Sequence, residues 1–180
     1  HRPLSRSRLD LEALQGVLTG DRPLVVNVHR ASDILAVLRL AREHGLRLVV
    51  QGGAEAWMVA EELAAADVPV VLKPLTNAPE DFSRLGARFD NAALLHEAGV
   101  RVVISTFDAH NARNLRWEAG NAMRFGLPRE AALRAVTLAP ARAYGLSGRY
   151  GTLEPGKVGN LVVWSGDPLS LASRPEQVIV

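Results

Sequence analysis

Four short runs of aliphatic and β-branched residues alternate with helix-like segments, and this alternation limits the possible folds more than any other feature of the sequence. The runs cover residues 24–29, 46–51, 69–73 and 100–107. The segments between and after them have apolar residues at helical spacing and cover residues 33–44, 54–66, 90–98 and 115–125. Runs that are apolar nearly throughout are typical of parallel strands buried on both faces and joined by helices. The sequence therefore predicts an α/β fold with a parallel sheet.

The alternation alone leaves two architectures open. Four parallel strands with their helices can be half of a TIM-type (β/α)8 barrel, or they can form a small open sheet with helices on both faces. No glycine-rich phosphate loop follows any of the strands, because Gly52-Gly53 alone is too short a signal. The pattern therefore gives the fold class but does not choose between the two architectures.

The character of the sequence changes after Gly126. Two short helices are expected at residues 130–136 and 140–144. A region rich in glycine and proline follows at 148–168 and encloses a strand at 160–164, and a last strand is expected at 177–180. We therefore divide the chain into residues 1–146, which contain the βα units, and residues 147–180, a small β appendage.

Composition excludes several classes of function. Hydrophobic residues make up 48% of the chain and charged residues 22%, which is typical of a globular protein. No apolar run approaches the roughly 20 residues of a membrane-spanning helix, so we expect no membrane partner, and no leader peptide is visible. The arginines are dispersed and few residues are aromatic, so we expect no nucleic-acid partner. The absence of cysteine excludes disulfides and thiolate chemistry.

Three segments near the end of the chain resemble a known family. They are GLPREAALRAVTLAPAR at 126–142, GTLEPGK at 151–157 and NLVVWSGDPL at 160–169. Together they resemble the C-terminus of amidohydrolase-superfamily enzymes, with imidazolonepropionase-like metal-dependent hydrolases as the nearest group. The alternative reading is ordinary turn chemistry, since Glu154-Pro155-Gly156 and Asp167-Pro168 are both good turns.

The resemblance implies that the four runs are strands 5–8 of a TIM-type barrel, and that the appendage belongs to an accessory β-sandwich. Strands 1–4 would then be absent, together with the His-x-His motif that the family carries in its first half. A half-barrel leaves open strand edges and an uncovered apolar face. We therefore expect the N-terminal half of the barrel or another partner chain to complete it, or a homo-oligomer to form, around a small-molecule substrate.

The family places a metal-binding histidine at the end of strand five, a second at strand six and a catalytic aspartate at strand eight. His29 fits the first place as a metal ligand; alternatively, it caps the strand and bonds near Ser32 and Asp33. Gln51 stands at the second place, where an amide binds zinc poorly, and we expect it to contact substrate. Phe107 stands where the aspartate is expected.

The loop after the fourth run carries the remaining candidates. Asp108, one residue later than the family pattern, is a candidate proton acceptor or else the anchor of the next helix. His110 is a candidate acid, base or ligand, with a backbone-bonded loop histidine as the alternative, and Asn111 is a candidate substrate contact. Lys73 can hold a substrate carboxylate or phosphate, or form an ion pair with Glu55.

The leading functional hypothesis is hydrolysis of a cyclic amide or related C–N bond by metal-activated water. The cofactor would be a divalent metal, zinc before others. The altered ligand positions support a second hypothesis, a catalytically silent subunit or fragment that binds a partner chain or a ligand and needs no cofactor. A third is a free-standing α/β domain unrelated to the barrel.

Overall fold

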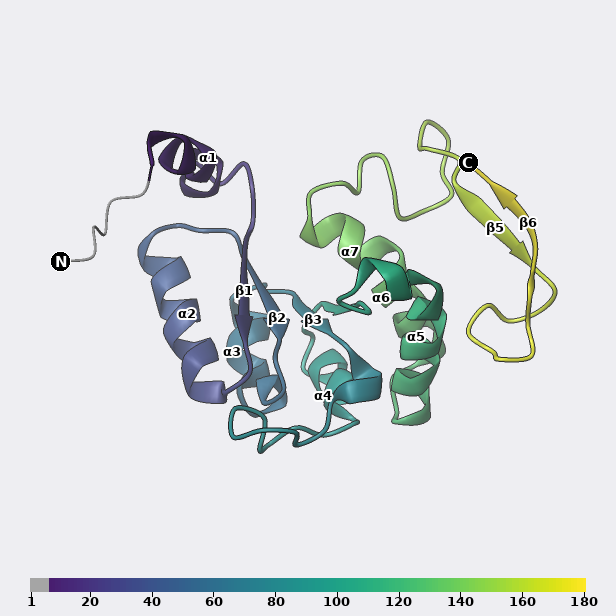
Figure 1. Cartoon of the computed structure of the whole chain (residues 1–180), viewed down its shortest axis with the longest axis horizontal. Helices are drawn as coiled ribbons and strands as arrows, with labels where there is room; N and C mark the ends of the chain where they lie inside the picture. Colours follow the sequence, from purple (N-terminus) through teal and green to yellow (C-terminus); the bar gives the residue numbers. More distant parts are fainter. Residues whose placement is uncertain (1–6) are drawn as a thin grey trace.

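The computed structural model describes residues 7–180, and its centre is a four-stranded parallel sheet in the order β1-β2-β3-β4 (Figure 1). The strands are β1 (Leu24–Val28), β2 (Leu48–Gly52), β3 (Val70–Leu72) and β4 (Val102–Ile104). All three pairings are parallel. The prediction of a parallel α/β fold is confirmed.

Helical connections join the strands, as parallel pairing requires. They include α2 (Ala31–Glu43), η1 (Ala56–Val59) with α3 (Ala60–Ala65), η2 (Pro74–Thr76) and α4 (Asn91–Glu97). After β4 come η3 (Ala109–Asn114), α5 (Leu115–Arg124), α6 (Arg129–Val136) and α7 (Leu138–Ala143). Among residues 7–180 no helix is long and apolar enough to span a membrane.

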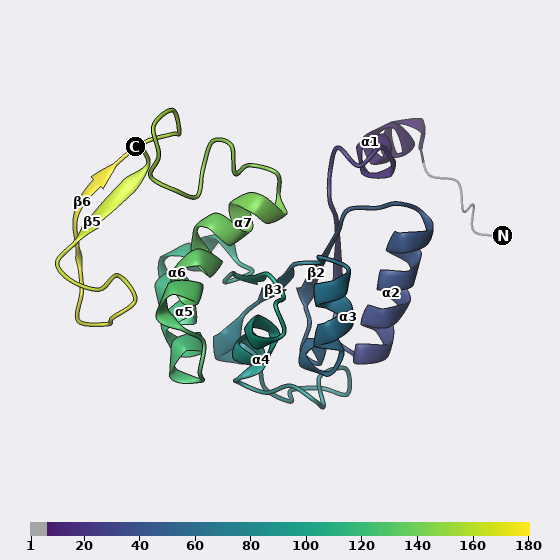
Figure 2. The same ribbon diagram turned by 180° about the vertical axis from the view of Figure 1, so that it is seen from behind.

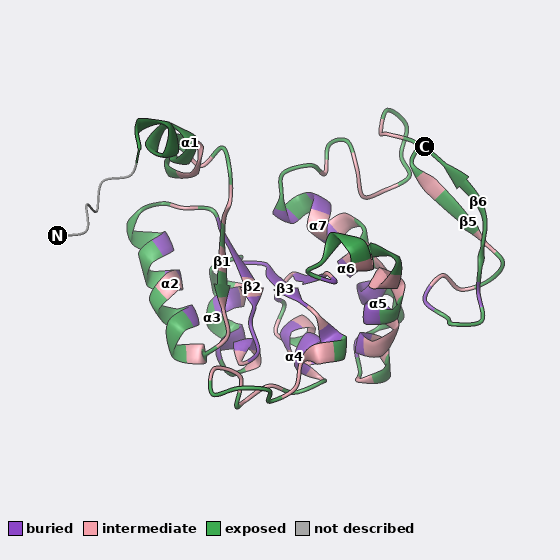
Figure 3. Ribbon diagram, viewed as in Figure 1, coloured by how far each residue is buried: buried purple, intermediate pink, exposed green. Residues whose placement is uncertain are grey.

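Alternate residues of the strands face opposite sides of the sheet, and both sides are buried in part. Val50, Val70 and Val102 belong to the main core, which the helices α2–α6 complete. Val49, Val71 and Val103 face the other way and pack with two alanines of α7. Figure 3 shows these strands as the most buried part of the molecule. The apolar character of the runs thus reflects burial on two faces.

The helix α1 (Arg8–Leu18) precedes the sheet, and the sequence pattern did not single it out. Ser7 and Asp10 form a reciprocal capping box that fixes its first turn. None of its residues is buried, and its leucines are among the exposed apolar side chains. Figure 2 shows it projecting from the sheet, away from the other helices.

The appendage contains β5 (Leu161–Trp164) and β6 (Pro175–Ile179), which pair antiparallel in a separate two-stranded sheet. Both expected strands in this region are therefore present, although β6 begins and ends earlier than expected. The division of the chain at residue 147 stays a prediction.

Candidate active site

The residues that follow the strands lie together at one end of the sheet. His29 follows β1, Gly52 ends β2, Lys73 follows β3, and Phe107 lies beyond β4. These four residues line one cavity of about 230 Å³, with Thr76, Asn77, Glu80 and Arg84 from the loop after β3. The carboxyl ends of parallel strands are where active sites are built in barrel enzymes.

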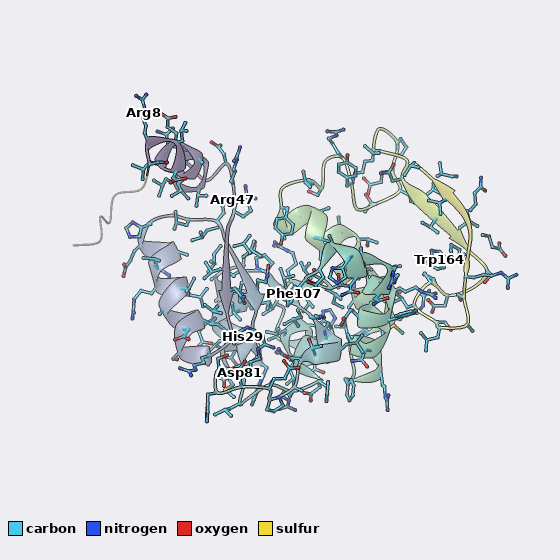
Figure 4. All side chains as sticks on the ribbon, in the orientation of Figure 1. Arg8, His29, Arg47, Asp81, Phe107 and Trp164 are labelled. Atoms are coloured by element: carbon cyan, nitrogen blue, oxygen red, sulfur yellow. The ribbon has the colours of Figure 1, made fainter. Side chains whose placement is uncertain are left out.

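The His29 imidazole has one nitrogen that is shielded from solvent. Its Nδ1 is buried and has no hydrogen-bond partner among the residues described. Burial lowers the pKa of His29, the positive charge of Arg84 lowers it further, and Asp81 opposes both. Figure 4 places His29 and Asp81 at the same end of the sheet. A neutral imidazole with an unused nitrogen is suited to binding a cation or accepting a proton.

The expected bond between His29 and the start of α2 is absent, since Nδ1 has no partner. The carboxylate of Glu55 caps that helix instead, accepting from the backbone N–H of Ala31 at 3.0 Å. The same carboxylate accepts from the N–H of Gly86 at 3.1 Å. The Glu55 carboxylate therefore accepts hydrogen bonds from the backbone of two segments. The expected Lys73–Glu55 ion pair does not form.

Lys73 pairs with Asp108 instead, at 3.8 Å between Nζ and Oδ2. Asp108 precedes η3, but its side chain caps no backbone N–H of that helix. Asp108 is nevertheless the N-cap residue of η3 and anchors its start through the backbone, since its carbonyl accepts from the N–H of Asn111 at 3.1 Å. Its carboxylate lies beside a second cavity, of about 430 Å³, which adjoins the first at Phe107.

Gln51 lines this second cavity, together with Asp108, Tyr144 and the apolar face of the sheet. It does not line the cavity that contains His29. The β2 residue in contact with His29 is Gly52, where an added Cβ would lie 2.6 Å from the ring Cε1. Its φ of +95° also favours glycine. Gln51 and His29 therefore face different cavities.

Phe107 adopts a left-handed backbone with φ of +59°, which is uncommon for a residue with a large side chain. Its N–H donates to the Ser105 hydroxyl at 3.0 Å, and the Thr106 hydroxyl donates to the Asp108 carbonyl at 2.9 Å. These two short-range bonds hold the turn. Phe107 therefore occupies the place between the two cavities, and Asp108 is turned toward Lys73.

Asn111 and His110 continue this polar chain outward. The Asn111 Nδ2 donates to Asp108 Oδ2 at 3.4 Å and lies 3.1 Å from the Nε2 of His110. Both residues belong to η3, and neither lines either cavity. The backbone bond expected for the His110 side chain is not among its contacts. The structure thus brings Lys73, Asp108, Asn111 and His110 into one connected row.

Sequence reasoning missed Glu118, Glu80 and Arg84. Glu118 on α5 is 2% exposed, and its carboxylate accepts from the N–H of Leu75 at 2.8 Å. Burial raises its pKa, while the Leu75 bond and the charge of Lys73 act in the opposite direction. A glutamate on the buried face of α5 could have been recognised from the sequence as a candidate for a functional residue. Arg84, bonded to Glu80 at 3.0 Å, lies in an irregular loop that gives no such pattern.

The described residues supply little of a metal centre. Within residues 7–180 no group of three or more histidine, cysteine, aspartate or glutamate side chains could hold a metal ion. His29 fits as one ligand because its Nδ1 is buried and unused. Its neighbours Gly52 and Phe107 offer no donor side chain. Glu80 and Asn77, which line the same cavity, offer oxygen atoms.

Residues 15–178 match the Amidohydrolase family. Amidohydrolase tasK from Hapsidospora irregularis is 36% identical over 86 residues, which are 47% of this chain and 9% of that protein. The structure of an amidohydrolase from Thermotoga maritima MSB8 has a TM-score of 0.88 at 33% identity, covering 98% of this chain and 46% of that one.

A more distant structure shares the fold alone. It is an adenosine deaminase from Xanthomonas campestris with bound zinc, with a TM-score of 0.55 at 24% identity, and 89% of this chain and 41% of that chain are covered. The present chain thus spans less than half the length of these relatives. Its four-stranded parallel sheet fits a partial TIM-type barrel. Since the family match extends over most of the sequence, this chain belongs to the amidohydrolase family.

Proposed function

We propose that this chain provides half of the active site of an amidohydrolase-type hydrolase that cleaves a C–N bond with water, a cyclic amide before other substrates. The observation that carries the proposal is His29, an imidazole with a lowered pKa and a buried Nδ1 that has no hydrogen-bond partner among the described residues, at the carboxyl end of the sheet. Family membership supports the reaction class. The position of Lys73 and Asp108 at the same end supports a shared site.

Each candidate has a role in this proposal. His29 would hold a divalent metal, zinc first, together with ligands from outside the described residues. Such a metal supplies a water molecule whose pKa is lowered toward neutrality. Asp108 would accept a proton, and the ammonium group of Lys73 lies 3.8 Å from its Oδ2. His110 would exchange that proton with solvent, and the Asn111 amide would bridge it to Asp108.

The same proposal assigns substrate contacts to the cavity beside Asp108. Its volume of about 430 Å³ lies within the range of small-molecule sites. Gln51 offers an amide and the strands offer an apolar wall, with Val71 and Val103 among its residues. Lys73 and Asn111 would meet a polar group of the substrate at the mouth.

We further propose that β1–β4 are strands 5–8 of the barrel and that another (β/α)4 segment closes it. The outer edge of β1 pairs with no strand among residues 7–180, and Val25 on that strand is exposed. The helix α1, none of whose residues is buried, lies beyond the start of β1 (Figure 1). The N-terminal half of the same barrel is the partner that fits both features, and a second copy of this chain is the alternative.

One observation favours a different function, a catalytically silent subunit. Gly52 packs against His29 where a second ligand would be needed, and Phe107 stands between the two cavities. A silent subunit would keep the fold and the cavities but bind no metal. It would act by binding a partner chain or a small ligand.

Metal analysis of the purified full-length protein separates these functions. After expression with added zinc, manganese or iron, an active-site half should yield one bound metal or more per chain. His29→Ala should lower that content by at least one metal per chain, whereas His44→Ala, an exposed helix-end histidine, should leave it unchanged. Metal-free protein after supplementation would contradict the hydrolase proposal and support the silent subunit.

A further inference from the structure

A second group of charged residues lies at the opposite end of the sheet, where the strands begin. Two hollows open there, of about 290 and 420 Å³. They adjoin at Asp67, Arg101 and Arg142, which line both, and we call the two hollows together the groove. In Figure 4 Arg47, which lines the second hollow, lies at the end of the sheet away from His29 and Asp81.

The groove has a surplus of positive charge. Arg47, Arg101, Arg134 and Arg142 line it, and Asp67 is the one carboxylate among its lining residues. Asp67 pairs with Arg101 at 2.5 Å. Arg134 and Arg142 form no ion pair within residues 7–180. The groove therefore keeps several guanidinium groups without an acidic partner.

Helix direction explains part of this surplus. Arg134 and Arg142 lie in the last turns of α6 and α7, where a cation complements the negative end of the helix. This accounts for one basic residue per helix end.

Arg47 and Arg101 need another reason, because they belong to no helix. They precede β2 and β4 and line the groove from the sheet itself. Arg47 bonds only the Gly20 carbonyl, at 3.1 Å, among the described residues. Adding these like charges to the helix-end arginines raises the electrostatic energy of the unliganded groove.

We propose that this arginine groove binds a small molecule with two or more anionic oxygen groups, phosphate-bearing before polycarboxylate. Guanidinium groups present planar pairs of N–H donors that match phosphate and carboxylate oxygens. A groove of this size admits a small molecule rather than a protein segment. The site is separate from the cavities at the carboxyl end of the sheet and does not depend on the proposed hydrolysis.

Calorimetric titration of the full chain with pyrophosphate, and separately with citrate, tests the groove. Saturable binding of one equivalent of either probe is expected. Arg142→Gln should weaken it by about tenfold or more, because a charge-assisted hydrogen bond is lost. Arg134→Gln, on α6, is a second variant and should act in the same direction.

Arg39→Gln is the matched control, since Arg39 is an exposed helix arginine that lines neither hollow. It removes the same charge and should change the affinity by less than about twofold. Circular dichroism would establish that each variant is folded. Equal weakening by the control, or the absence of saturable binding of both probes, would overturn the proposal. Tighter binding of citrate than pyrophosphate would overturn its preference for phosphate.

Discussion

Gly52→Ala should destabilise the protein much more than an ordinary glycine-to-alanine change in a left-handed turn. The new Cβ would lie 2.6 Å from Cε1 and 3.0 Å from Nδ1 of His29, and 2.9 Å from the Asn27 amide oxygen. Both neighbours are side chains, so the ring and the amide would have to shift. The φ of +95° adds a backbone penalty that does not depend on these contacts.

The two contributions can be given magnitudes. A residue with a Cβ in the left-handed region costs about 1–2 kcal/mol. Forcing an extra carbon into a packed position costs about 1–3 kcal/mol more. The free energy of unfolding should therefore fall by about 2–5 kcal/mol. Displacing the ring should also expose it and raise the pKa of His29 toward its ordinary value.

Gly99→Ala is the matched control, because Gly99 has a similar φ of +87° and an added Cβ there would meet no atom within 4 Å. Urea unfolding of both variants and the parent separates the backbone and contact contributions. NMR titration of the His29 ring gives the second readout. Equal destabilisation by the two variants, with an unchanged His29 pKa, would refute the inference that the ring is packed on Gly52.

Other substitutions test the surroundings of the site. Arg84→Gln removes a charge that lowers the pKa of His29, so that pKa should rise in an NMR titration; an unchanged value would contradict the contact. The raised pKa of Glu118 means that its stabilising contribution is present at acid pH and lost as pH rises through that pKa. In Glu118→Gln the free energy of unfolding in urea should therefore depend less on pH above the ordinary carboxyl pKa, and it should not be lower at neutral pH. A loss of stability at neutral pH would show that the carboxylate is needed. Trp57→Phe removes the 2.8 Å bond from Nε1 to the Gly86 carbonyl and should cost about 1 kcal/mol in urea unfolding, whereas an unchanged stability would mean that the bond contributes nothing.

The parallel sheet could be predicted because its strands have apolar side chains on both faces. Val49 and Val50 are both buried although they point to opposite sides, so the run is apolar throughout rather than alternating. Strand boundaries were less well determined. The run 46–51 became β2 at Leu48–Gly52, because Leu46 and Arg47 lie before the strand and Gly52 pairs with Val28.

The candidate site was predicted only in part, because its residues meet through tertiary packing. The sequence shows where each strand ends, so His29 and Lys73 could be placed at the same end of the sheet, where both line one cavity. Which partner each takes depends on loop paths that no local pattern encodes. Lys73 reaches Asp108 rather than Glu55, and Gln51 faces the cavity away from His29.

The two ends of the sheet should behave as independent parts of the molecule. The strands β1 and β2 have five residues each, which places their ends about 15 Å apart. At that separation, changes without shared partners add in free energy within a few tenths of a kcal/mol. The change that the double variant Gly52→Ala/Arg142→Gln causes in the free energy of unfolding, measured with urea, should therefore equal the sum of the changes caused by the two single variants. A clear excess or deficit would mean that the groove and the His29 cavity are coupled through the sheet, and that a ligand at one end could influence the other.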